Sequence, residues 1–302
     1  MGRAHYRDKV AIITGGASGI GAALAKHLGE LGARVVVADR QHELAQSVVQ
    51  AIQSSAGTAV ATQLDVRELS AVQRVVADTV ARWGAVDFFF NNAGIGVGGE
   101  VASYSMADWT DVLDVNLLGV IHGIQAVYPV MVGQRSGHII NTASMAGLVT
   151  SAGQTSYAVS KHAVVGLSKS LRIEAKFHGV RVSVLCPGAI RTPILRGGKF
   201  GRIQLNAAAQ AELAKMWETL RPMPVDELAP KVAKAVVRDE PYIIYPTWWR
   251  WVWYLDKLSP ALSSKLCELS YARFRKHMLA DTQPMSEPTE QPAEPKRKTA
   301  DM

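Results

Sequence analysis

The stretch TGGASGIGAALAKHL, residues 14–28, joins an apolar run to a helical pattern through three glycines, Gly15, Gly19 and Gly21. The preceding run KVAIIT, at 9–14, has the β-branched character of a buried strand. Glycine weakens both strands and helices, so its use here indicates a need for space. Backbone N–H groups at a helix N-terminus attract an anion, and the helix dipole adds partial positive charge. An ordinary tight turn would also accept these glycines.

An acidic residue favours a nucleotide site over a simple turn. Asp39 ends the second apolar run, ARVVVAD at 33–39, and lies 18 residues after Gly21. A carboxylate at this place can accept both hydroxyls of an adenosine ribose. The sequence therefore predicts a dinucleotide site. Asp39 favours NAD, because a carboxylate repels the 2′-phosphate of NADP. The adjacent Arg40 would offset part of that repulsion, which leaves NADP as the alternative.

Strand and helix patterns alternate along the chain as far as about residue 190. This alternation predicts an α/β fold, a doubly wound parallel sheet of the Rossmann type with helices on both faces. Further strands are expected at 58–65, 86–92, 137–144 and 180–186, and helical patterns begin near 42, 69, 106 and 155. We expect a single catalytic domain at 1–247 with a substrate lid at about 190–225, a Trp-rich basic helical extension at 248–280, and a disordered tail at 281–302.

Composition narrows the class of protein. The 302 residues are 48% hydrophobic and 20% charged, which suits a cytoplasmic protein with a full core. The net charge of +7 is scattered along the chain, which argues against nucleic acid as a partner. Cys186 and Cys267 lack metal-ligand spacing, so we expect neither a metal site nor a disulfide framework. The N-terminal residues lack the apolar run of a secretory signal.

Further motifs connect the chain to a known family. The glycine stretch matches TGxxxGxG, the residues 91–94 match NNAG, and Tyr157 and Lys161 match Tyr-x-x-x-Lys. Over about residues 7–245 the sequence resembles the classical short-chain dehydrogenases/reductases. The resemblance implies a catalytic tetrad of Asn116, Ser144, Tyr157 and Lys161. It implies cofactor contacts from Gly15, Ala17, Ser18, Gly19, Ile20, Gly21, Asp39, Arg40, Asp65, Val66, Asn92, Ala93, Gly94, Tyr157, Lys161, Pro187, Gly188, Ile190 and Thr192.

The resemblance also assigns individual roles. Asp65 would face the adenine amino group, with Val66 beside the ring. Thr192 would bond the nicotinamide carboxamide, with Ile190 against that ring. Asn116 would hold a water that links the lysine to solvent. The residues alone leave plainer alternatives open, namely a strand-terminal aspartate that starts a turn and a polar position within a helix.

Tyr157 and Lys161 suit proton transfer. They are four residues apart, so they share one face of a predicted helix. A free phenol has a pKa of about 10, and a nearby ammonium lowers it. Tyr157 can then take a hydroxyl proton while hydride leaves for the cofactor. Ser144 follows a predicted strand, where its hydroxyl can bond the substrate oxygen. The alternatives are a packed tyrosine with a lysine beside it, and a serine that caps a helix.

These features predict an NAD(P)-dependent oxidoreductase that interconverts a secondary alcohol and a ketone. A nucleotide-sensing protein without catalysis, and a dehydratase or epimerase, are the alternatives on the same fold. The region after Thr192 is apolar apart from three basic residues, which favours a bulky steroid-, retinoid- or lipid-like substrate. Its apolar residues are Ile194, Leu195, Phe200, Ile203, Leu205, Met216 and Trp217.

The C-terminal segment has its own character. Residues 250–277 carry six Lys/Arg against two Asp/Glu, and 248–253 contain four tryptophans. Aromatic and basic side chains are typical of a segment that lies on a membrane surface. A helix packed on a partner subunit or over the pocket would have the same composition. We expect peripheral membrane contact through 248–277 or one of these packing roles. The resemblance implies a homodimer or homotetramer.

Overall fold

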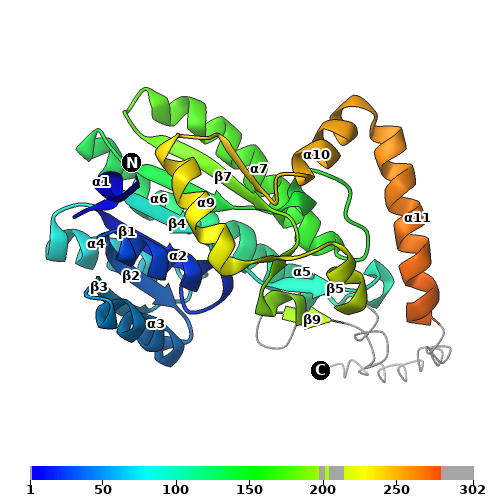
Figure 1. Cartoon of the computed structure of the whole chain (residues 1–302), viewed down its shortest axis with the longest axis horizontal. Coiled ribbons are helices and arrows are strands. Elements are labelled where there is room, and N and C mark those ends of the chain that lie inside the picture. Colours follow the sequence, from blue (N-terminus) through cyan, green and yellow to red (C-terminus); the bar gives the residue numbers. More distant parts are fainter. Residues whose placement is uncertain (1, 197–200, 204–213, 280–302) are drawn as a thin grey trace, which may run out of the picture.

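A seven-stranded parallel sheet forms the centre of the molecule, with helices on both faces (Figure 1). The computed structural model describes residues 2–196, 201–203 and 214–279. The strand order is β11-β7-β6-β4-β1-β2-β3, which confirms the predicted doubly wound fold. The strands are β1 Val10–Thr14, β2 Arg34–Asp39, β3 Thr58–Gln63, β4 Phe88–Asn91, β6 His138–Thr142, β7 Arg181–Pro187 and β11 Tyr242–Tyr245.

The helices cover the sheet in two layers. One hydrophobic cluster joins the sheet to α1, α2, α3 and α9, and the other joins it to α4, α6, α7 and α10. Strands buried on both sides are expected to contain continuous apolar runs, as β1 does at 10–13 and β2 at 35–38. The helices are α1 Gly2–Tyr6, α2 Gly19–Glu30, α3 His42–Ser54, α4 Leu69–Trp83, α5 Met106–Leu113, α6 Gly119–Gln134, α7 Thr155–Lys176, α9 Val225–Val237, α10 Trp249–Leu258 and α11 Pro260–Leu279.

The helical region predicted from residue 106 is one long apolar helix with an irregular turn. A π-helical turn, Asp114–Leu118, separates α5 from α6. Within these 29 residues an 18-residue window has a mean hydropathy of 1.5, so length and composition alone would allow a membrane crossing. In the fold, however, Val120, Val127 and Met131 pack into the core between α6 and the sheet. The helix is therefore a core helix of the domain.

The region after residue 190 contains elements that the sequence did not reveal. The helix α9 and the edge strand β11 complete the sheet, although β11 has only four residues. Two short ladders form in the lid region. Within it, β8 Ile190–Arg191 pairs with β10 Met223–Pro224, and β9 Gly201–Ile203 pairs with β5 Gly96–Gly98 of the body. In the part of the lid that the structure describes, residues 214–219 are helical. The predicted tail lies outside the described residues.

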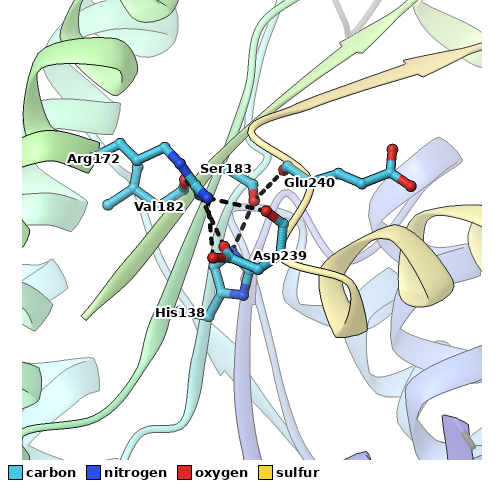
Figure 2. Close-up of polar contacts among 6 residues, drawn as sticks. All are labelled: His138, Arg172, Val182, Ser183, Asp239 and Glu240. Carbon is cyan, nitrogen blue, oxygen red and sulfur yellow. Dashed lines mark hydrogen bonds and ion pairs between the residues drawn. The ribbon is translucent and has the colours of Figure 1, made fainter. Parts of the chain in front are cut away.

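A polar cluster fixes the turn between α9 and β11 to the sheet (Figure 2). Arg172 of α7 donates to both carboxylate oxygens of Asp239, at 2.8 and 3.0 Å. Ser183 donates to the Glu240 carbonyl at 2.7 Å, and His138 Nε2 lies 2.8 Å from the Ser183 hydroxyl oxygen. Because the hydroxyl has one hydrogen, which it donates to Glu240, His138 must donate from Nε2. The cluster lies toward the amino end of β6, away from the candidate site.

Candidate active site

A cavity of about 620 Å³ lies at the carboxyl ends of β1, β4, β6 and β7. The strand order reverses there: from β1 the chain adds β2 and β3 on one side of the sheet, and then β4 and the later strands on the other. Ligands of open α/β sheets bind at such switch points. Every predicted site residue except Ala17, Gly21 and Asn116 lines this cavity.

The three glycines of residues 14–28 have different structural roles. Gly15 and Gly19 line the cavity and have left-handed φ values of 62° and 51°, which favour glycine. Gly21 does not line it. A Cβ on Gly21 would collide with the Gly15 carbonyl oxygen and lie 2.6 Å from Asn92 Nδ2. The space at Gly21 therefore serves the close packing of α2 on the turn.

Asp39 is buried with its carboxylate at the edge of the cavity. Its Oδ2 accepts from the Ala17 backbone N–H at 3.0 Å, and its Oδ1 accepts from that of Gln41 at 2.9 Å. A carboxylate offers about four acceptor positions, so about two remain for ribose hydroxyls. Ala17 thus orients Asp39 instead of lining the cavity. The geometry fits the ribose of a dinucleotide.

The adenine end contains an arginine that the sequence analysis missed. Arg67 donates to both carboxylate oxygens of Asp65, at 2.5 to 3.0 Å. These hydrogen bonds, with a smaller contribution from Arg40, lower the pKa of Asp65. Arg40, Arg67 and Val66 all line the cavity. The Asp-x-Arg spacing could have indicated this ion pair. An arginine near a strand end is usually a solvated surface residue, however, so the spacing was not used.

Ser144, Tyr157 and Lys161 meet at the centre of the cavity. Ser144 follows β6 and its Oγ accepts from the Ala146 N–H at 3.1 Å, so it also caps a short helix. Tyr157 and Lys161 project from α7, with Lys161 Nζ 5.4 Å from the centre of the Tyr157 ring. Lys161 Nζ donates to the Thr142 carbonyl at 2.8 Å. The predicted grouping of these three side chains is confirmed.

The electrostatics of this group differ from the expectation. Burial raises the pKa of Tyr157, and a hydrogen bond with Ser144 offsets only part of that rise. Burial also lowers the pKa of Lys161 to about 8. The prediction that Lys161 lowers the tyrosine pKa is wrong for the chain alone, because burial outweighs every other influence on the phenol. The neighbouring Cys186 is fully buried and burial raises its pKa to about 12, as expected for an unreactive thiol.

Asn116 lies behind the cavity wall, in the π-helical turn. Its Nδ2 donates to the Ile95 carbonyl at 2.9 Å, and its Oδ1 accepts from the Ile95 N–H at 2.8 Å. A Cβ on Gly94 would lie 3.3 Å from Asn116 Oδ1 and 3.5 Å from Lys161 Nζ. Gly94 therefore lies between Asn116 and Lys161, and its lack of a side chain leaves the space between them open. The two bonds to Ile95 hold the chain after the NNAG motif in place.

The substrate end is apolar and includes the C-terminal helices. Ile194, Leu195, Met216 and Trp217 line it as expected. Phe200 and Leu205 lie outside the described residues, and Ile203 is described only by its backbone in β9. Trp249 of α10 and three residues of α11, Cys267, Ser270 and Tyr271, also line the cavity. The described residues contain no group of three or more His, Cys, Asp or Glu side chains that could hold a metal.

Residues 9–199 match the family model of the short chain dehydrogenases. The chain belongs to this family. As a short-chain oxidoreductase the protein uses a nicotinamide dinucleotide, and the glycine turn and Asp39 at the cavity fit that cofactor. The matched residues include the tetrad and the glycine turn, but they end before most of the lid and before α10 and α11.

Relatives of known structure and name agree with this membership. A short chain dehydrogenase/reductase from Burkholderia phymatum, solved in complex with NAD, has a TM-score of 0.77 and 30% identity, covering 85% of this chain and 95% of its own. The levodione reductase of Leifsonia aquatica is 34% identical over 235 residues, 77% of this chain and 87% of its own. A 2,5-dichloro-2,5-cyclohexadiene-1,4-diol dehydrogenase of Sphingobium indicum is 39% identical over 186 residues, 62% of this chain and 74% of its own.

Proposed function

We propose that this protein is an NAD-preferring dehydrogenase/reductase that interconverts a secondary alcohol and a ketone. The observation that carries the proposal is that Ser144, Tyr157 and Lys161 line the same cavity, with Lys161 Nζ 5.4 Å from the centre of the Tyr157 ring. A binding protein without catalysis would not need this arrangement of a proton donor, an oxygen-binding hydroxyl and a buried ammonium. We assign the catalytic domain to residues 1–247, with α10 and α11 as an extension.

The side chains divide the chemistry among them. The nicotinamide ring, when bound, exchanges a hydride with the substrate carbon. The hydroxyls of Ser144 and Tyr157 hold the substrate oxygen. Tyr157 donates its proton to that oxygen in reduction and takes one from it in oxidation. Lys161 is one residue in the path by which that proton is exchanged. A raised pKa of Tyr157 keeps the phenol protonated, which suits the reductive direction.

We assign the remaining contacts from the same positions in the cavity. Asp39 binds the adenosine ribose, while Arg40 and Val66 lie along the adenosine half. Ile190 and Thr192 contact the nicotinamide. The apolar wall of Ile194, Leu195, Met216 and Trp217 supports a bulky, hydrophobic substrate. The names of two relatives, a levodione reductase and a chlorinated cyclohexadienediol dehydrogenase, support a cyclic one.

The test is reduced-nicotinamide absorbance with a panel of cyclic ketones and alcohols, each with NAD(H) and NADP(H). Tyr157→Phe should reduce kcat by about 10²- to 10⁴-fold, because it removes the proton donor. Its NADH dissociation constant, measured by fluorescence, should stay within about twofold, about 0.4 kcal/mol. A variant that keeps most of its kcat would disprove the role of Tyr157. Cofactor binding without turnover of any substrate would instead favour the nucleotide-sensing alternative.

We also infer a homo-oligomer, as in the family, and a peripheral contact of the outer face of α10 and α11 with a membrane surface. This face exposes large apolar side chains, including Trp251 at 75% and Leu258 at 85%. Lys257, Lys265 and Arg273 lie on the same two helices. Trp251→Ser with Leu258→Ser should abolish sedimentation with anionic vesicles. Equal sedimentation of this variant and the parent would exclude the contact, and a change of oligomeric state instead would assign the face to a partner subunit.

A further inference from the structure

Helix α11 packs against the substrate end of the cavity at two loops. Cys267, Ser270 and Tyr271 are within five residues of one another and all line the cavity. Cys267 Sγ lies 3.7 Å from the Thr150 carbonyl oxygen. Gly153 has a φ of 77°, and a Cβ there would lie 3.2 Å from the Tyr271 ring. Both loop residues lie between Ser144 and Tyr157 in the sequence, so α11 rests on the segment that joins two catalytic residues.

A second contact ties the same helix to the loop that follows β5. Glu100, which follows β5, accepts from the Tyr271 hydroxyl at 3.1 Å and from Arg275 Nε at 2.6 Å, both through Oε1. These bonds lower the pKa of Glu100, so its carboxylate is charged at neutral pH. The Gly99 N–H donates to the Gly153 carbonyl at 2.9 Å, which joins the loop after β5 to the loop at residues 150–153. We call Glu100, Tyr271 and Arg275 the latch.

Beyond the latch and the loop at residues 150–153, α11 is joined to α10 and has an exposed outer face. It follows α10 through Ser259, whose φ and ψ of −147° and 81° are not helical. Its outer face is exposed, with Leu262, Leu266 and Leu269 each about half accessible. Figure 1 shows α10 and α11 at one end of the molecule, with α10 next to α7. The position of α11 over the cavity therefore depends on the latch, on the contacts with residues 150–153, and on α10, where the Ser263 hydroxyl donates to Asp256 Oδ1 at 2.7 Å.

We propose that α11 is a specificity wall of the substrate site, held over the cavity by the latch. Ser270 and Cys267 set the space left for the substrate, and Tyr271 both lines the cavity and anchors the helix. The wall excludes ketones that extend beyond it and leaves cofactor binding unchanged. The substrate half of this inference rests on the proposed ketone reduction, whereas the latch does not.

The wall is tested with two identical substitutions on one helix. Ser270 lies at the cavity although it is partly open to solvent, so Ser270→Trp adds a large side chain there, whereas Ser264→Trp places the same side chain on an exposed position of α11 that does not line the cavity. The probes are cyclohexanone, 2-decalone and a steroid 3-ketone. We expect Ser270→Trp to lower kcat/KM about tenfold or more for the larger ketones and about twofold at most for cyclohexanone. The dissociation constant of NADH should not change. Equal kinetics of the two variants on every ketone would overturn the wall.

The latch is tested without activity, by the rate at which a maleimide labels Cys267. Cys186 is fully buried, and peptide mass spectrometry distinguishes the two thiols. Arg275→Ala and Glu100→Gln should raise the rate about two- to fivefold, the change expected for loss of an exposed ion pair. Arg273→Ala removes the same charge two residues away, outside the latch, and should match the parent. Equal rates for all variants would overturn the latch. If the parent reduces no ketone, the proposed function fails, and the labelling alone decides whether the latch holds α11 in place.

Discussion

At the scale of single residues, the Asp39 carboxylate is the group that chooses the cofactor. Asp39→Ala removes its two backbone hydrogen bonds and its free acceptor positions, while Arg40 and Arg67 stay at the cavity. We expect NAD to bind about tenfold to a hundredfold more weakly, as for lost hydrogen bonds to a charged group, and NADP to bind no worse. Titrations of both cofactors measure this. An equal loss for NAD and NADP would refute the ribose contact and indicate a disturbed turn, which thermal unfolding of the variant would reveal.

The resemblance to the family predicted which of these side chains gather in one site, but not their charge states. Ser144, Tyr157 and Lys161 follow from motif spacing, because a strand end and one helix face bring them together. The pKa of Tyr157 depends on how deeply the ring is buried, and a sequence contains no such number. Arg67 was missed for a related reason. Its ion pair with Asp65 depends on side-chain geometry beside the cavity.

At the scale of elements, α10 supports the loop that follows β7. A Cβ on Gly188 would collide with Nε1 and Cδ1 of the Trp249 indole, although Gly188 has no left-handed φ. Gly188→Ala should therefore destabilise the protein by about 1–3 kcal/mol, as overpacking does, and weaken cofactor binding. Urea unfolding and NADH titration measure both effects.

A second substitution tests the cause. Trp249→Leu should restore much of the loss in a double-mutant cycle, because it removes the colliding ring. Gly133→Ala is the matched control, since a Cβ on that exposed residue of α6 meets no atom within 4 Å. It should stabilise the protein by about 0.5–1 kcal/mol. Additive losses from Gly188→Ala and Trp249→Leu would show that the two residues do not interact.

The elements differ in how well the sequence predicts them. Those before residue 190 alternate regularly, so their apolar periodicity is sufficient to locate them. The strand β11 is too short for any periodicity, and β7 and the cluster around Arg172 and Asp239 fix its place. The docking of α11 depends on Glu100, which lies 171 residues from Tyr271 in the chain. No local sequence pattern predicts such a contact, so membrane contact and packing on a partner subunit or over the pocket all remained open.

At the scale of the whole molecule, the buried histidine of Figure 2 makes stability depend on pH. His138 is inaccessible to solvent, its Nδ1 has no hydrogen-bond partner, and Arg172 already pairs with Asp239. Burial lowers the pKa of His138 well below 6.5, and the charges of Arg181, Arg172 and His5 add to this. The folded protein therefore keeps this ring neutral, while the unfolded chain protonates it below about pH 6.5. The histidine has no such effect above that pH, and the folded state is destabilised increasingly as pH falls below it.

The expected loss is about 1–1.5 kcal/mol of unfolding free energy between about pH 7.5 and about pH 5.5, measured by urea denaturation. Carboxylates titrate in the same direction, so the comparison must be between variants. His138→Gln keeps a side-chain donor for Ser183 but cannot titrate. Between the same two pH values its unfolding free energy should fall by about 1–1.5 kcal/mol less than that of the parent, whatever its stability at neutral pH. His162→Gln, at an exposed position of α7, should follow the parent. A parent and a His138→Gln variant with parallel pH profiles would mean that His138 is protonated in the folded protein, and that the cluster tolerates a charge on its unpartnered nitrogen.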